Sequence, residues 1–271
     1  MVRCIDELVP VRKIRITGGE PLLRRGLPLF IRKLRRLLPP AEIAMTTNGT
    51  LLERYAFPLR RAGLDAINVS LDVPTSDGFL ALTGRDLLPS VMRGLAAAQI
   101  AGFSRLKINT VLLRNHNGDR LLALVELARR HSCEIRFIEL MPLGAASDLF
   151  QEEYLPAGEA LARLGQTYTL VRTLQRNGTA TRYLFRDGTS LFIVGFIESI
   201  SHPFCTSCDR VRLDSYGRLF SCLRATGSLD LASISAGNRS AADRRAISIF
   251  LQSKRAPGRS WPKRDMAGIG G

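Results

Sequence analysis

The segment KIRITGGEPLL, residues 13–23, holds the strand-to-loop transition that decides the fold. Its first four residues belong to the short segment RKIRI (12–16), whose β-branched isoleucines favour a strand. TGGEP (17–21) follows directly, and adjacent glycines at the carboxyl end of a strand let a ligand approach the backbone closely. In α/β barrels the active site lies at that end. A simple tight turn would also use these glycines and is the alternative.

Further strand-like segments follow, separated by amphipathic stretches with helical spacing. They are EIAMT (42–46), DAINVSL (65–71), LKINTVLL (106–113) and EIRFIEL (134–140). This alternation predicts a parallel sheet or barrel. Because five strands are few for a closed barrel, we expect a partial (β/α) TIM-like barrel over residues 1–144.

After Met141 the pattern becomes rich in β-strand signals. The candidate strands lie in TYTLVRT (167–173), TRYLFRDGTSLFIVGFIES (181–199) and RVRLDSYGRLFSCL (210–223). Turn signals occur at Asp187-Gly188 and Tyr216-Gly217. We therefore predict a small β-rich domain over residues 145–235, followed by a basic tail, 236–271.

The composition favours an anionic partner. The 271 residues carry a formal charge of +15, and the isoelectric point is near 10.6. The basic residues are spread along the chain with few aromatic residues between them, which argues against a nucleic acid. Such a charge excess is more often a solvated surface than a binding groove, and a polyphosphate substrate would also use it. No apolar run approaches the ~20 residues of a membrane helix, and the N-terminus resembles no signal peptide. The expected location is the cytoplasm, without membrane attachment.

Basic residues also occur inside the strand-like segments. Lys13, Arg15, Lys107 and Arg136 lie among apolar residues. An unpaired buried cation is costly, so each needs a carboxylate or an anionic ligand. Four of them on three strands indicate phosphates, although a salt bridge or an exposed edge would explain any single one. Polar residues of TTNG (46–49) and NVSLD (68–72) should converge at the same mouth.

Three of the five cysteines share one segment. Cys205, Cys208 and Cys222 have the spacing C-x2-C-x13-C around a predicted hairpin. With His202 they could hold zinc, which the spacing alone favours, and three thiolates could also hold an iron–sulfur cluster with one open iron. Arg210 and Arg212 would share one face of a strand beside the site. A closed zinc site needs no such arginines, whereas an open iron whose ligand carries phosphates does.

The ordered set of motifs resembles one family. KIRITGGEPLLRR, TTNG, INVSLD, RFIEL-M, SHPFC-x2-C, R-x-RL and the terminal M-x2-IGG are similar to those of the molybdenum cofactor biosynthesis protein A family. These are radical S-adenosylmethionine (SAM) enzymes, the GTP 3',8-cyclases. The resemblance covers residues 11 to about 230 and implies a lyase that converts GTP to 3',8-cyclo-7,8-dihydro-GTP. It also implies a downstream pyranopterin synthase as partner, and a second copy of the chain is a further candidate partner.

The resemblance assigns roles residue by residue. Cys205, Cys208 and Cys222 match the ligands of a C-terminal [4Fe-4S] cluster whose open iron binds guanine. The matches to SAM contacts are Gly19, Ser70 and Met141, and Gly270 and Gly271 match a tail that reaches the active site. The positions implied to contact GTP are Lys13, Arg15, Thr46, Lys107, Arg136, Arg210 and Arg212.

One departure concerns the radical-generating cysteines. The family carries an N-terminal C-x3-C-x2-C that binds a second [4Fe-4S] cluster, and nothing in this sequence matches it. We interpret the chain as N-terminally truncated and missing the first barrel strand, through a misplaced start or as a remnant. As written, it is expected not to start radical chemistry. The rivals are a different radical SAM enzyme and a zinc-containing, basic nucleic-acid-binding protein.

Overall fold

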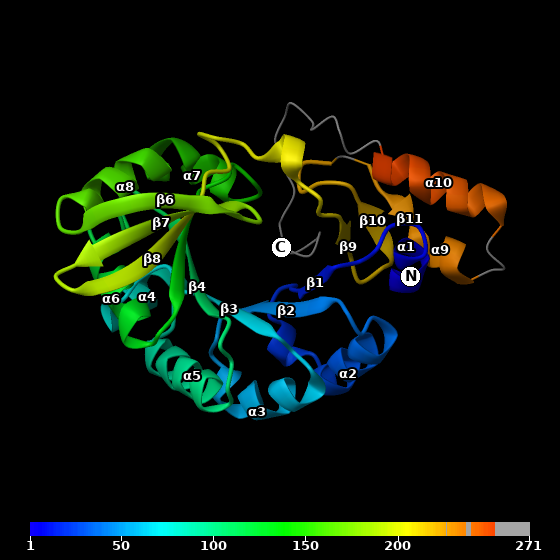
Figure 1. The fold of residues 1–271 in the computed structure, drawn as a ribbon, viewed down its shortest axis with the longest axis horizontal. Helices are drawn as coiled ribbons and strands as arrows, with labels where there is room; N and C mark the ends of the chain where they lie inside the picture. Colours follow the sequence, from blue (N-terminus) through cyan, green and yellow to red (C-terminus); the bar gives the residue numbers. More distant parts are fainter. Residues whose placement is uncertain (226, 237–239, 253–271) are drawn as a thin grey trace.

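The computed structural model describes residues 1–225, 227–236 and 240–252 (Figure 1). Most of the predicted basic tail, including Gly270 and Gly271, lies outside these residues. The architecture is α/β: Figure 1 shows the strands of the main sheet as an open arc with helices along its outer side. The predicted fold class, an open partial barrel, is confirmed.

The main sheet has eight strands in the order β1-β2-β3-β4-β5-β8-β7-β6. The strands β1 to β5 run parallel to one another, and β8 pairs in parallel with β5. β7 pairs in antiparallel fashion with both β8 and β6. Their bounds are β1 (Lys13–Ile16), β2 (Glu42–Thr47), β3 (Ala66–Ser70), β4 (Leu106–Leu112), β5 (Glu134–Glu139), β6 (Thr169–Asn177), β7 (Ala180–Asp187) and β8 (Ser190–Ile197). The strands predicted between residues 12 and 140 are therefore all present.

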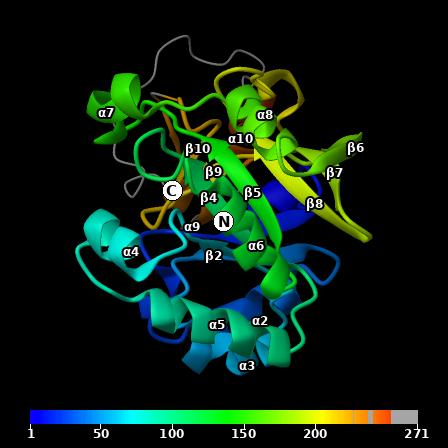
Figure 2. The same ribbon diagram turned by 90° about the vertical axis from the view of Figure 1, so that its left-hand side faces the viewer.

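The helices that follow these strands cover the outer face. Figure 2 shows α2, α3 and α5 together on that side, where α3 packs against both others. The helices of this part are α2 (Leu27–Leu37), α3 (Leu52–Ala62), α4 (Ser76–Thr83), α5 (Leu88–Ile100), α6 (Leu121–Arg130), α7 (Ala146–Glu153) and α8 (Ala157–Gly165), with a short 3-10 turn, η1 (Pro21–Leu23). Gly63 ends α3 with φ of 98°, a left-handed conformation that glycine adopts without strain.

Three of the strands predicted for a separate domain from residue 145 extend the main sheet instead. β8 pairs in parallel with β5, placing Ile135 beside Val194 and Phe137 beside Phe196. The rings of Phe137 and Phe196 lie 5.5 Å apart in the core. The apolar face of β8 thus completes the barrel core, which explains why β6–β8 join it.

A small second unit follows, and we call β9–β11, α9 and α10 the C-terminal unit. Its elements are β9 (Arg212–Leu213), β10 (Arg218–Phe220), β11 (Leu229–Asp230), α9 (Leu231–Ala236) and α10 (Ala241–Gln252), preceded by a 3-10 turn, η2 (Cys205–Ser207). The N-terminal helix α1 (Val2–Asp6) packs here, because Cys4 and Ile5 share a core with Leu219, Leu231 and Ile247. In the described residues, no helix is both long and apolar enough to cross a membrane.

Candidate active site

The inner face of the sheet carries a row of charged residues. The strand register places Lys107 beside Glu134, and it places Arg136 beside Gly195, which in turn lies beside Arg182. Glu134 and Arg136 are two residues apart on β5, so their side chains leave the same face. Three strands, β4, β5 and β7, thus direct these charged side chains toward one side of the sheet.

Glu134 is the centre of this row. Its Oε1 lies 2.6 Å from Arg136 Nε and 3.2 Å from Lys107 Nζ, and its Oε2 lies 3.6 Å from Arg182 Nη2. Burial alone would raise the pKa of Glu134, but the charges of Arg136 and Lys107 outweigh it and hold that pKa below its usual value. One carboxylate therefore faces three cations, and the cluster keeps an excess of positive charge.

The excess of positive charge affects the pKa of Lys107. Burial and the charge of Arg136 lower the pKa of Lys107 to about 8, even though Glu134 opposes the shift. A cation that is partly destabilised in this way gains when an anion binds beside it. The predicted phosphate-binding role of Lys107 and Arg136 is consistent with this electrostatic setting.

Arg15 connects the cluster to the C-terminal unit. Water reaches part of the Arg15 side chain, but protein atoms surround its guanidinium group and remove most of its hydration. This desolvation lowers the pKa of Arg15 to about 10, and the positive charges of Arg210 and Arg136 lower it further. Arg212 also contributes to this shift. The structure therefore brings together Arg15, Arg136, Arg210 and Arg212, although they come from distant parts of the sequence. Figure 1 shows β1, the edge strand of the main sheet, between β2 and β9.

Lys13 differs from these cations. Its Nζ lies 2.8 Å from Glu42 Oε1, and Arg105 Nη1 lies 3.1 Å from the other carboxylate oxygen. The Lys13 side chain is 47% exposed. Its charge is already balanced by Glu42, which makes it the weaker candidate for a phosphate contact.

The polar residues at the strand ends are tied together by Glu20. Thr47 Oγ1 donates to Glu20 Oε1 at 2.7 Å, and the Asn48 backbone N–H donates to Oε2 at 2.7 Å. The TGGEP and TTNG motifs are thereby held side by side. The other predicted residues lie at or beyond strand ends: Thr46 and Met141 are half-buried, and Gly19 and Ser70 are exposed.

Asp72, in the loop after Ser70, has an unusual protonation equilibrium. Burial raises its pKa to about 6, against a 2.7 Å hydrogen bond donated by the Val111 backbone N–H. The carboxyl group can thus gain or lose a proton near neutral pH. NVSLD pointed to this loop, but only the burial shows that Asp72 is its distinctive group.

Glu139, which the sequence analysis did not single out, anchors the segment that leads to the cysteines. It accepts hydrogen bonds from the backbone N–H groups of Ile200 (2.8 Å), Ser201 (2.9 Å) and Ala157 (2.9 Å), and from Ser201 Oγ (2.6 Å). An acidic residue at the end of the apolar strand RFIEL was the available signal. This carboxylate fixes the start of the cysteine segment to β5.

Two of the three cysteines of the predicted metal site, Cys208 and Cys222, lie near the same arginine. Cys208 and Cys222 both lie close enough to Arg212 to raise its pKa, while burial and Arg210 lower it overall. Within the described residues, however, no group of three or more His, Cys, Asp or Glu side chains could hold a metal ion. Thiolates repel one another until a metal bridges them, so the geometry of such a site is completed by its metal. Cys205, Cys208 and Cys222 have the thiolate groups that iron–sulfur clusters require, but their side chains are not already arranged around one point.

His202 does not join the cysteines. Its Nδ1 lies 3.2 Å from Glu198 Oε1, and its side chain is 72% exposed. The proposed fourth zinc ligand is therefore directed to a carboxylate. None of the five cysteines, which all lie in described residues, forms a disulfide.

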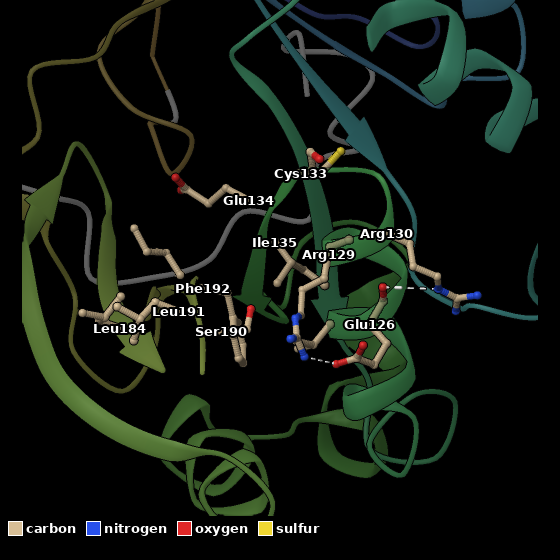
Figure 3. Close-up of a pocket in the computed structure, with 14 residues that line it drawn as sticks. Glu126, Arg129, Arg130, Cys133, Glu134, Ile135, Leu184, Ser190, Leu191 and Phe192 are labelled. Carbon is tan, nitrogen blue, oxygen red and sulfur yellow. Dashed lines mark hydrogen bonds and ion pairs between the residues drawn. The ribbon is translucent and has the colours of Figure 1, made fainter. Parts of the chain in front are cut away.

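A separate pocket of about 650 Å³ lies between α6, the start of β5 and the β7–β8 hairpin (Figure 3). Arg129 lies over the Phe192 ring at 4.5 Å and pairs with Asp187 at 2.8 Å. Burial raises the pKa of Cys133 to about 12, which makes it a poor nucleophile. Figure 3 shows Arg129 paired with Glu126 as well, so this arginine already has two carboxylate partners.

Comparison with known proteins now adds to this geometry. The family described as Radical SAM superfamily matches residues 1–128, and Molybdenum Cofactor Synthesis C matches residues 133–258. A solved radical SAM methyltransferase from Sphaerobacter thermophilus is 21% identical with a TM-score of 0.45, over 61% of this chain and 50% of that one.

Curated relatives are closer in sequence. The GTP 3',8-cyclase of Ectopseudomonas mendocina is 42% identical over 82% of this chain and 67% of its own length. GTP 3',8-cyclase 1 of Pseudomonas aeruginosa is 40% identical over 83% of this chain and 68% of its own length. The chain spans about two thirds of these proteins, and it belongs to the GTP 3',8-cyclase family of molybdenum cofactor biosynthesis within the radical SAM superfamily.

Proposed function

We propose that this chain binds GTP along the inner face of the sheet and acts in the conversion of GTP to 3',8-cyclo-7,8-dihydro-GTP. The observation that carries the proposal is the meeting of Arg15 with Arg136, Arg210 and Arg212, three cations whose charges lower its pKa. Placing several positive charges close together, partly away from water, costs free energy. Such an arrangement is typical of a site that binds an anion. A triphosphate would bring further negative charge to this group of cations.

The residues divide the ligand between two ends of the site. Lys107, Arg136 and Arg15 form the phosphate end, and Arg210 and Arg212 lie beside the cysteines. We assign Cys205, Cys208 and Cys222 as ligands of a [4Fe-4S] cluster, which when bound offers one open iron to the guanine base. The protein itself orients the nucleotide between these ends and neutralises its phosphates.

SAM would bind across the carboxyl ends of the strands, at Gly19, Ser70 and Met141. Glu20 supports this assignment because it fixes the loop that carries Gly19, and the Asp72 loop follows Ser70 directly. The sequence contains no C-x3-C-x2-C motif, so its residues do not fit the second cluster of the family. We therefore derive no radical-generating step from them.

Two further expectations rest on the same assignment. Five cysteines without a disulfide suit a reducing compartment such as the cytoplasm. A pyranopterin synthase that consumes the cyclised product, and a second copy of this chain, remain the proposed protein partners.

Nucleotide binding tests the proposal. We expect the anaerobically purified protein to bind GTP more tightly than ATP in calorimetry, because the open iron and nearby donors distinguish the base. Arg210→Ala or Arg212→Ala should each weaken GTP binding by about 1.5–3 kcal/mol, the usual loss of a charge-assisted contact.

Arg93→Ala is the control, since Arg93 lies on the outer helix α5 with 56% of its side chain exposed and pairs with Glu53. It should leave GTP affinity unchanged. Equal affinity for GTP and ATP would contradict the proposed recognition of the guanine base. Wild-type GTP affinity in both the Arg210→Ala and the Arg212→Ala variants would contradict the proposed GTP site.

A further inference from the structure

Arg182 of β7 takes part in the charged row but has no assigned role. Its guanidinium is 3.6 Å from Glu134, farther than that of Arg136 at 2.6 Å or the ammonium of Lys107 at 3.2 Å. Its side chain is 24% exposed, and its Nε atom is buried without a hydrogen-bond partner among the described residues. A buried donor without a partner costs free energy, so a purely structural role explains Arg182 poorly.

The sheet makes room for this arginine. Gly195 lies between Arg136 and Arg182 in the register of β5, β8 and β7. A Cβ atom at Gly195 would lie 3.1 Å from Arg136 Cγ and 3.7 Å from its Nε. The absence of a side chain there makes room for the stem of Arg136, and the strand register places Arg182 on the other side of the same glycine. Two guanidinium groups that come from neighbouring parts of one sheet face suit a tetrahedral oxyanion.

The order of the strands gives the order of the cations along the site. Arg15 is on β1 at one edge of the main sheet, Lys107 and Arg136 are on β4 and β5, and Arg182 is on β7 beyond β8. Figure 1 shows the C-terminal unit, which carries the cysteines, on the β1 side and away from β7, so Arg182 is at the end of the series farthest from the cysteines. A nucleotide whose base is at the cysteine end would direct its last phosphates toward Arg182.

We propose that Arg182 binds the terminal phosphate of the nucleotide and makes the site select triphosphates over monophosphates. This inference rests on the proposed GTP site and extends it to a residue of β7. Arg136 and Lys107 hold the inner phosphates, and Arg182 is reached only by a chain of three. Glu134 positions these three cations while the site is without its ligand.

Binding of inorganic triphosphate, GMP and GTP to the anaerobically purified full chain tests this. Arg182→Ala should weaken inorganic triphosphate and GTP about tenfold or more, and should change GMP by no more than about twofold. Arg182→Gln removes the charge with less loss of volume, and the same pattern is expected. Arg186→Ala is the matched control, because Arg186 is on the same strand and exposed.

The outcomes separate this inference from the proposed function. Wild-type affinity for triphosphate in either Arg182 variant would overturn the inference, as would an equal loss for GMP, while the GTP site would stand. If the wild-type protein binds inorganic triphosphate and not GTP, the proposed function fails and the phosphate site remains. If Arg182→Ala does not fold, the Arg182→Gln result decides.

Discussion

The main sheet and the C-terminal unit are built in different ways. The sheet has eight strands over one extensive core that includes Phe137, Phe185 and Phe196, all nearly inaccessible to water. The C-terminal unit has strands of two or three residues and a small core around Leu219 and Leu231. Figure 1 shows the two lying side by side.

This difference indicates what holds each half of the site in place. The proposed phosphate end lies on strands that their own packing stabilises, so Lys107, Glu134 and Arg136 are positioned without a ligand. The cysteine end lies on a unit whose apolar core is too small to specify its loops. Small domains of this kind commonly depend on a metal for their structure. The two ends should therefore respond differently to the same disturbance.

The largest effect is expected from Cys208→Ser, which rests on the proposed cluster. Losing one of three thiolates should reduce bound iron about tenfold or more, from about four irons per cluster. Hydrogen exchange should quicken in β9 and β10 and stay unchanged in β2–β4. Cys133→Ser is the control, because Cys133 lies beside the separate pocket. If Cys208→Ser kept its iron, or if hydrogen exchange quickened equally in the main sheet, the two halves would not differ in their dependence on a metal.

A core truncation in the sheet should come next. Phe137 is fully buried, so Phe137→Ala should lower the free energy of unfolding by about 3–5 kcal/mol in urea titrations. Leu23→Ala, at a side chain 73% exposed, should change it by less than about 0.5 kcal/mol. A small effect at Phe137 would mean that the sheet, like the C-terminal unit, depends on something other than its packing.

The smallest effect concerns pH. The pKa of Lys107 is about 8, so its positive charge is present below that pH and is lost as the pH rises through it. Affinity for inorganic triphosphate should therefore fall about two- to tenfold between pH 7 and 9. Lys107→Arg should flatten this dependence, since arginine stays protonated.

The same fall should appear in the Cys208→Ser protein, because the phosphate end needs no cluster. Calorimetry at both pH values checks each variant. An unchanged slope in Lys107→Arg would assign the proton to another group, and a slope lost in Cys208→Ser would show that the two halves are coupled.

Local patterns predicted much of the sheet. The segment 65–71 is β3 (Ala66–Ser70), and 134–140 is β5 (Glu134–Glu139), because short segments that are rich in β-branched and aromatic residues favour strands. The same patterns could not say that β8 joins β5, since strand pairing connects residues far apart in the chain. The division of the chain at residue 145 was an expectation from the change in sequence pattern and from turn signals, and the hydrogen-bonded sheet extends beyond it.

The candidate site divides in a similar way. Arg15, Lys107 and Arg136 were visible as cations in apolar strands, which is an anomaly that a sequence reveals. Glu134, Glu139 and Arg182 were not, because a carboxylate or an arginine on a strand is ordinary until its neighbours are known. Their roles come from the strands that meet around them.

By itself the sequence determined the order of the motifs, the type of most strands and the family to which the chain belongs. These properties depend on residue identity and on spacing along the chain. Only the tertiary structure decided that one carboxylate faces Lys107, Arg136 and Arg182, and that Arg15 lies near Arg210 and Arg212. Charge interactions depend on distance in space and on burial, and the fold alone sets both.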